Sequence, residues 1–371
     1  MSNPQLVHHS NTLLASEIHY YNTKSYSYLF NSLPDIMSTD FGATDDSLVT
    51  NFTKVIHRKP YPAISPIKPS LSQAGRTVLI TGGGVGIGKA IAHNFVLASA
   101  ATIVIIGRRL EKLEETASEL DATAEKAGKT TKIIARSCDV TDDIGVKNLW
   151  DDLGKKGVFV DVLVLNSATD TANQSLFELG IAEVWSQFEA NVKGPLHFAE
   201  CFHKQVQQGP KKAKYLVNVS SSVIHLHGMC DAMETLTVTL LNAYEGHPAF
   251  DGRPGYSVTK GSGTLAIQSL AYQFTPEEMQ VINYHPGAIY GRAWKDQGVP
   301  EDGFDFDDPN LPGAFAVWAA SRDASFLHGR YVFCHWDVEE LADSEVGSRL
   351  KSDRDYLKLT VKGLNWMKKD F

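Results

Sequence analysis

The sequence predicts an α/β protein built on a single doubly wound parallel sheet of about seven strands, with helices on both faces. Two observations predict this fold class. Short apolar runs recur from Thr77 onward and alternate with helical patterns, as expected for a series of βαβ units. The first of these runs also breaks directly into a glycine-rich turn that opens a helix.

The expected strands are short and apolar throughout, which is typical of parallel strands buried on both faces. They are Thr77–Thr81, Thr102–Ile106, Ile133–Cys138, Val162–Leu165, Tyr215–Val219, Val281–Tyr284 and Tyr331–Cys334. Residues 1–74 are rich in Ser, Thr, Asn and Tyr without sustained periodicity, so we expect an N-terminal extension there. Prolines between Lys59 and Ser70 predict an extended chain laid over a surface before the core domain, residues 75–371, begins.

The composition excludes several functional classes. The chain of 371 residues holds no apolar run of the roughly 20 residues that a membrane span requires, and its start lacks a signal-peptide pattern. A formal charge of −8 argues against nucleic acid as a partner. The cysteines and the histidines near strand ends lack metal or disulfide spacing, so we expect a cytoplasmic protein with no structural metal and no membrane partner. These residues are Cys138, Cys201, Cys230, Cys334, His225, His227 and His285.

The turn after the first strand, Gly82-Gly83-Gly84-Val85-Gly86-Ile87-Gly88, has the glycine spacing of a pyrophosphate-binding turn. Gly82 allows the tight turn, Gly86 lets the backbone approach the phosphates, and Gly88 lets the helix pack closely on the strand. A flexible turn is the alternative for a glycine cluster alone. The strand before it and the helix after it favour a bound nucleotide cofactor.

The end of the second strand predicts which dinucleotide is bound. An acid at this place takes the ribose 2′-hydroxyl in NAD-preferring proteins, but here Gly107 stands there and Arg108 and Arg109 follow. Positive charge favours a 2′-phosphate, so we expect NADPH, with NADH as the less favoured cofactor. Two solvated arginines at a helix start are the alternative interpretation.

Tyr256 and Lys260 lie four residues apart and therefore on one face of a helix. The spacing alone is weak, because Tyr20 and Lys24 repeat it in the N-terminal extension. Position distinguishes the two pairs. Tyr256 follows the fifth expected strand and its serines, and a long apolar-periodic helix continues after it, so the phenol is expected at the sheet edge where ligands bind.

At these positions the chain resembles the short-chain dehydrogenase/reductase family, across about residues 74–340 and in motif order. Thr81–Gly88 resembles the family's glycine motif, and Asp139-Val140 the pair that contacts adenine. Asn191, Ser221, Tyr256 and Lys260 resemble the catalytic tetrad, and Pro286-Gly287 resembles the turn beside the nicotinamide. The tail around Gly329-Arg330-Tyr331 and Trp336-Asp337-Val338 is most similar to reductases of filamentous fungi.

The resemblance implies a Rossmann-type fold, a set of cofactor-binding residues and a role for each member of the tetrad. Tyr256 would exchange a proton with the substrate oxygen, Lys260 would favour the phenolate and hold the ribose, and Ser221 would orient the carbonyl. Asn191 would fix a water of the proton relay. Ser220 and Ser222 are rivals of Ser221, but alternation along the strand turns both away from its face. The expected cofactor-binding residues are Thr81, Gly82, Gly84, Val85, Gly86, Ile87, Gly88, Arg108, Arg109, Asp139, Val140, Asn166, Ala168, Tyr256, Lys260, Pro286, Gly287 and Ile289.

The chain departs from the family pattern at three places. Thr169 replaces the glycine of the motif that begins at Asn166, so packing against the cofactor is looser or rearranged there. An insertion at 225–254, with a helix-like stretch at 233–244, forms a lid, an interface segment or a neutral surface insertion. After Pro286-Gly287 the family's threonine is missing, so a hydroxyl contact to the carboxamide comes from Tyr290 or is absent.

These observations predict an NADPH-dependent oxidoreductase, a ketoreductase of secondary metabolism that reduces a ketone or oxidises the matching secondary alcohol. Aromatic residues in the stretch 291–312 suit a bulky hydrophobic small molecule, and a disordered acidic loop is the alternative. A nonredox isomerase, dehydratase or cyclase on the same fold is the second hypothesis, and a nucleotide-sensing protein ranks last. The family also implies a homodimer or homotetramer, formed through the apolar faces of Val184–Phe202 and Leu265–Phe274.

Overall fold

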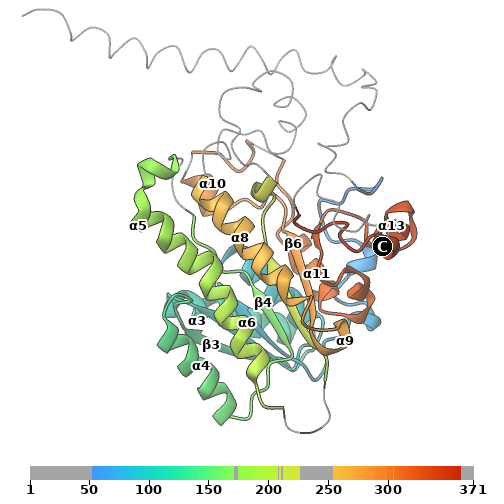
Figure 1. Ribbon diagram of the computed structural model, residues 1–371. Helices are drawn as coiled ribbons and strands as arrows, with labels where there is room; N and C mark the ends of the chain where they lie inside the picture. The colour runs from blue at the N-terminus through green and yellow to red at the C-terminus, as the bar shows by residue number, and fades with distance from the viewer. Residues whose placement is uncertain are drawn as a thin grey trace, which may run out of the picture. The chain divides into compact units, whose positions relative to one another are not determined.

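The computed structural model describes residues 52–170, 174–207, 209, 212–225, 254–296, 298–303 and 305–360. Within them, seven parallel strands form one sheet in the order β3-β2-β1-β4-β5-β6-β7 (Figure 1). The strands are β1 (Thr77–Thr81), β2 (Thr102–Gly107), β3 (Lys132–Ser137), β4 (Val162–Leu165), β5 (Lys214–Val219), β6 (Gln280–His285) and β7 (Tyr331–Phe333). The predicted fold class is confirmed, and every predicted strand boundary lies within one residue of the observed one. The order reverses between β1 and β4, which is where such sheets bind ligands.

Alternate residues of each strand enter two different hydrophobic cores, as the pleat of a strand requires. Val78 and Ile80 join the core beneath α2 (Gly86–Leu97), α3 (Leu110–Lys126) and α11 (Asn310–Ala319). Leu79 joins the core beneath α4 (Asp143–Lys155), α6 (Gly194–Lys204) and α8 (Pro254–Leu270). Because both faces of the sheet are covered, the strands read as continuous apolar runs in the sequence.

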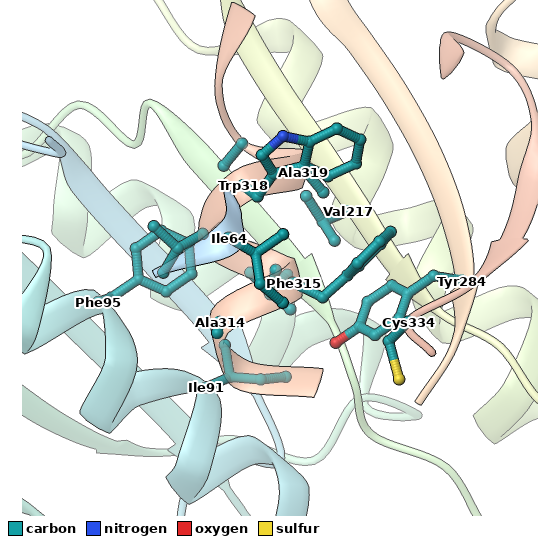
Figure 2. Packing of buried hydrophobic residues seen from close by; sticks show 14 of the residues in the cluster. Ile64, Ile91, Phe95, Val217, Tyr284, Ala314, Phe315, Trp318, Ala319 and Cys334 are labelled. Carbon is teal, nitrogen blue, oxygen red and sulfur yellow. The ribbon is translucent and has the colours of Figure 1, made fainter. Parts of the chain in front are cut away.

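The proline-rich stretch before β1 contributes to the first core. Figure 2 shows Ile64 among Phe95 of α2 and Phe315 and Trp318 of α11. Ile64 and Leu71 are fully buried, and they lie in two short 3-10 helices, η3 (Pro62–Ile64) and η4 (Pro69–Leu71). The segment just ahead of Gly75 is therefore packed into the fold, whereas residues 1–51 lie outside the described part.

The helix that precedes β5 is interrupted. It consists of α5 (Leu176–Phe188), the π-helix η5 (Glu189–Lys193) and α6, and it runs beside α8 (green and orange in Figure 1). A capping box of Ser175 and Glu178 starts α5. The remaining helical segments are η6 (Ser222–His225), α9 (Pro276–Met279), α10 (Arg292–Lys295), η7 (Arg322–Leu327), α12 (Val338–Asp343) and α13 (Glu345–Ser352).

Several predictions about the chain concern features outside this core. The insertion lies outside the described residues from 226 to 253. In the described part of the chain, no helix is long and apolar enough to cross a membrane. Among the same residues, no cluster of His, Cys, Asp and Glu is suited to hold a metal, and Cys138, Cys201 and Cys334 are free thiols.

Candidate active site

The turn between β1 and α2 is built on three glycines with distinct requirements. Gly82 and Gly86 have φ angles of 66° and 54°, in the left-handed region that favours glycine. A Cβ atom on Gly88 would collide with the backbone carbonyl oxygen of Gly82. The structure thus bears out the predicted tight turn at Gly82 and the close helix packing at Gly88, and it leaves the N-terminal N–H groups of α2 facing a cavity.

This cavity, of about 660 Å³, extends from the glycine turn to the start of α8 and brings most of the predicted site residues together. Its wall includes Gly82, Gly84, Val85, Gly86, Ile87, Arg108, Arg109, Asp139, Val140, Asn166, Ala168, Tyr256, Lys260 and Pro286. Of the other predicted residues, the wall does not include Thr81, Gly88, Asn191, Ser221, Gly287 and Ile289. A cradle of glycine backbone at a helix N-terminus, with cations near one end, fits a dinucleotide such as NAD(P).

Thr81 and Asn166 connect the ends of β1 and β4 by hydrogen bonds. The Thr81 Oγ1 accepts hydrogen bonds from the backbone N–H groups of Asn166 at 2.9 Å and Ser167 at 3.0 Å. The Asn166 Nδ2 donates to the Thr81 carbonyl oxygen at 3.0 Å. These bonds fix the ends of β1 and β4 relative to each other at the point where the sheet order reverses.

Asn191 lies in the π-helix and connects two segments. Its Oδ1 accepts from the backbone N–H of Thr169 at 2.8 Å, and its Nδ2 donates to the Thr169 carbonyl oxygen at 2.9 Å and to Thr259 Oγ1 at 3.0 Å. Both amide hydrogens are therefore used by protein partners. Thr169, which replaces the family's glycine, is anchored here without a positive φ angle. Thr259 was missed by the sequence analysis, although it directly precedes Lys260.

The π-helix has a cause in the sequence. Pro195 lies four residues after Asn191, and because proline lacks an amide hydrogen it cannot bond to the Asn191 carbonyl as an α-helix requires. The helix expected to carry Asn191 is present, and its hydrogen bonds change to the π-helical pattern over Glu189–Lys193. A Cβ atom on Gly263 of α8 would collide with the same carbonyl oxygen, so α8 passes very close to it.

Lys260 is buried, and its Nζ donates to the backbone carbonyl oxygen of Val219 at 2.6 Å. Burial disfavours the charged form and lowers the pKa of the Lys260 ammonium to about 8. The side chain therefore remains mostly protonated at neutral pH. Tyr256, one turn earlier on α8, is half-buried and lies on the same cavity wall.

The three serines after β5 have different partners. The Ser220 Oγ lies 2.5 Å from Thr264 Oγ1 of α8. The Ser222 backbone N–H donates to His285 Nδ1 at 3.1 Å. The Ser221 Oγ accepts from the Val223 N–H at 3.3 Å, and among the described residues its own hydrogen is donated to no partner. β5 ends at Val219, so strand alternation does not reach these serines, and the cavity wall includes Ser220 but not Ser221. These contacts therefore do not single out Ser221, whose assignment rests on the family resemblance.

The segment after β6 carries its own apolar cluster. Trp294 is buried with Ala288 and Val299, and its ring centroid lies 5.0 Å from that of Phe306. The Tyr290 hydroxyl donates to the Val299 carbonyl oxygen at 3.2 Å. These aromatic side chains pack against one another within the loop, and the Tyr290 hydroxyl is engaged there.

The cationic end of the cavity includes one more residue than predicted. Arg108 and Arg109 are exposed, and Lys112 joins them on the wall. Glu115 accepts from the Lys112 Nζ at 2.9 and 2.7 Å, which partly offsets its charge. The signal was available in the sequence, since Lys112 lies in the first turn of the helix that follows Arg108 and Arg109.

Comparison with known proteins agrees with this geometry. Residues 76–232 match the family model described as short chain dehydrogenase. A short chain dehydrogenase/reductase of Claviceps purpurea is 31% identical over 309 residues, which cover 82% of this chain and 92% of that protein. The short chain dehydrogenase/reductase AacuD of Aspergillus aculeatus is 28% identical over 309 residues, covering 83% of this chain and 95% of that one.

Solved structures share the fold at lower identity. The L-sorbose reductase of Gluconobacter frateurii, solved with NADPH and L-sorbose, has a TM-score of 0.57 at 20% identity, covering 71% of this chain and 96% of that one. A 7α-hydroxysteroid dehydrogenase, solved with NADH and a 7-oxo bile acid, has a TM-score of 0.56 at 19% identity, covering 71% and 94%. The glycine turn, the cavity and these relatives agree: the chain belongs to the short-chain dehydrogenase/reductase family and is an NAD(P)-dependent oxidoreductase.

Proposed function

We propose that this enzyme uses NADPH to reduce a ketone on a bulky hydrophobic small molecule, or oxidises the matching secondary alcohol. One observation carries the proposal. Tyr256 and Lys260 lie one helical turn apart on the wall of the cavity that the glycine turn also lines. A phenol beside a buried ammonium is suited to proton exchange with a substrate oxygen.

The roles of Tyr256, Lys260 and Ser221 are those that the family resemblance implies, and the role of Asn191 is argued from its contacts. The bound cofactor supplies or accepts the hydride. Tyr256 gives a proton to the carbonyl oxygen in reduction, Lys260 favours the phenolate that remains, and Ser221 donates a hydrogen bond to the same oxygen. Asn191 acts by holding Thr169 and α8 in register, because both of its amide hydrogens are taken by those segments.

The cavity wall supports NADPH over NADH. Gly107 carries no acid that would repel a 2′-phosphate, and Arg108, Arg109 and Lys112 place positive charge at the same end.

The surroundings of Tyr256 support an apolar substrate. Pro286 and Ala293 on the cavity wall carry no charge, and Trp294, the next residue after Ala293, belongs to an apolar cluster with Ala288 and Val299. Because the chain is similar to short chain dehydrogenase/reductases of Aspergillus aculeatus and Claviceps purpurea, we place the substrate among secondary metabolites.

The experiment that tests the function combines binding with turnover. The purified protein is titrated with NADPH and with NADH, and the preferred cofactor is then mixed with a panel of bulky ketones while its absorbance is followed. Tight NADPH binding and ketone-dependent oxidation are expected. A folded protein that binds neither cofactor and turns over no ketone would contradict the proposal and favour nonredox chemistry.

We also propose that the enzyme assembles as a homodimer through α5 and α8. Ile181 and Trp185 lie one turn apart on α5 and are 79% and 60% exposed, and Phe177, which is 100% exposed, precedes the kink of α5 at Gly180. Leu265 of the neighbouring α8 is 47% exposed. Large exposed apolar side chains on adjacent helices are typical of subunit interfaces.

A further inference from the structure

A buried carboxylate lies directly beneath the turn that follows β6. The Asp307 side chain is fully buried, and its Oδ2 accepts hydrogen bonds from the Ala288 backbone N–H and from His335 Nε2, both at 2.8 Å. The Asp307 backbone N–H donates in return to the Ala288 carbonyl oxygen at 2.8 Å. Because a carboxylate only accepts, His335 Nε2 carries the hydrogen of this bond. Asp307 therefore forms hydrogen bonds with both the N–H and the carbonyl oxygen of Ala288.

Gly287, the residue before Ala288, lies very close to this carboxylate. A Cβ atom on Gly287 would lie 2.6 Å from Asp307 Oδ2 and 3.0 Å from His335 Nε2. Gly287 also has a φ angle of 90°, which a side chain rarely allows. Pro286, one residue earlier, is part of the cavity wall. The carboxylate therefore packs against a turn that also borders the cavity.

The segment that precedes the core also contacts Asp307 and His335. The Arg58 Nη1 lies 3.6 Å from Asp307 Oδ1 and 3.2 Å from Asp305 Oδ2. The Asp308 backbone N–H donates to the Arg58 carbonyl oxygen at 2.9 Å, and the His57 N–H donates to the His335 carbonyl oxygen at 2.8 Å. These contacts come from residues before position 76, where the family match begins.

A second histidine joins this cluster to the serines after β5. The His285 and His335 ring centroids lie 5.7 Å apart, and His285 Nδ1 accepts from the Ser222 backbone N–H. His285 directly precedes Pro286, and Ser222 directly follows Ser221. The cluster therefore connects the two backbone segments that carry site residues at the ends of β5 and β6. A buried carboxylate needs several N–H donors to offset its lost hydration, and this one has them.

We propose that Asp307, held by His335 and Arg58, is a positioning residue that fixes the Pro286–Ala288 turn against the nicotinamide half of the cofactor. The inference rests on the proposed function and extends it to residues on the N-terminal segment. Without the carboxylate, the Ala288 N–H loses its acceptor and the turn loses the group that it packs on. Misplacement of a cofactor-contacting turn costs turnover even when the fold survives.

The test compares Asp307→Ala with Asp305→Ala, a matched control that removes an exposed carboxylate from the same loop and the same arginine. Hydrogen exchange of the backbone amides in residues 287–290 is expected to rise by about tenfold or more in Asp307→Ala and to stay unchanged in Asp305→Ala. We also expect kcat to fall by about tenfold or more. The preferred dinucleotide is expected to lose affinity, while its adenosine half binds as in the wild type.

Asp307→Asn keeps an oxygen that accepts from Ala288 and is expected to recover most of this loss. If Asp307→Ala does not fold, His335→Ala replaces it, with a smaller loss of the same kind expected because one donor to the carboxylate is removed. Unchanged exchange in 287–290, or equal loss of affinity for the dinucleotide and its adenosine half, would overturn the inference. A wild-type protein that binds no dinucleotide contradicts the proposed function instead, and the exchange comparison alone then decides whether Asp307 holds the turn.

Discussion

We propose that Arg108 and Arg109 select the cofactor by their charge, since both side chains are exposed on the cavity wall and Gly107 places no acid at the end of β2. Replacing both by alanine is expected to weaken NADPH binding by about tenfold to a hundredfold, because charge-assisted hydrogen bonds to the 2′-phosphate are lost. NADH binding is expected to change by no more than about twofold, since NADH has no such phosphate. Titration calorimetry with each cofactor measures both constants.

A control separates this local effect from the change in net charge. Lys155→Ala with Lys156→Ala removes two positive charges from the exposed end of α4, away from the cavity wall. It should leave both affinities unchanged. Equal weakening of NADPH and NADH by the arginine variant would show that these arginines do not select the cofactor.

At the scale of single residues, the spacing of residues in the sequence predicts contacts within one helix. It does not predict contacts between segments that only the tertiary fold brings together. Tyr256 and Lys260 share one helix, so their separation in sequence was enough to place them on one wall. The Asn191 bonds to Thr169 and Thr259 join three segments, 22 and 68 residues apart in sequence, and no local pattern indicates them. The same holds for Asp307 and His335.

At the scale of elements, the close packing of the glycine turn allows us to predict how substitutions change the free energy of unfolding. Gly88→Ala places a Cβ atom against the Gly82 carbonyl, and is expected to lower the free energy of unfolding by about 1–3 kcal/mol through overpacking. Gly154→Ala is the matched control, because Gly154 lies exposed in α4 with nothing near its Cβ position. That change is expected to raise the free energy of unfolding by about 0.5–1 kcal/mol.

Urea denaturation of the two variants and the wild type measures these differences. Opposite signs are the expected result. A Gly88→Ala variant as stable as the wild type would mean that α2 can move away from β1 at little cost, and close packing would then not explain this glycine.

The elements also show why strands were easier to predict than the interrupted helix. Each strand is an apolar run buried on both faces, and its boundaries follow from composition. The helix that carries Asn191 was expected from the family resemblance and from the apolar face of Val184–Phe202, and the structure is helical across this range with a π-helix at Glu189–Lys193. The interruption comes from one missing amide hydrogen at Pro195, a backbone effect that hydrophobic periodicity does not register.

At the scale of the whole molecule, the exposed apolar side chains of α5 predict the assembly. Ile181→Asp places a charge in the proposed interface and is expected to shift the sedimenting species from dimer to monomer. Val206→Asp, at a residue 89% exposed beyond the end of α6, is the control and should leave the mass unchanged. A wild type that sediments as a monomer at micromolar concentration contradicts an α5–α8 interface.

The fold of the core followed from the sequence, and packing of the N-terminal extension on the core was one of the expectations, but the local conformation of the segment just ahead of the core was not predicted. The prolines of residues 59–70 predicted an extended chain on a surface, whereas Ile64 is fully buried beside α11 and Leu71 is fully buried in the same core. The apolar residues of this stretch carry no periodic signal, and the burial of Ile64 depends in part on α11, more than 200 residues later. The roles of residues 1–51 and of the insertion remain predictions, because both lie outside the described residues.

The central claim is that Tyr256 exchanges the proton in a redox reaction whose cofactor lies in the described cavity. The most direct measurement compares Tyr256→Phe with Tyr290→Phe, a second tyrosine near the site whose hydroxyl bonds to Val299. Tyr256→Phe is expected to lower kcat/KM for the ketone by about a hundredfold or more while NADPH affinity changes little. Tyr290→Phe is expected to retain turnover. A Tyr256→Phe enzyme that reduces the ketone as fast as the wild type would contradict the claim.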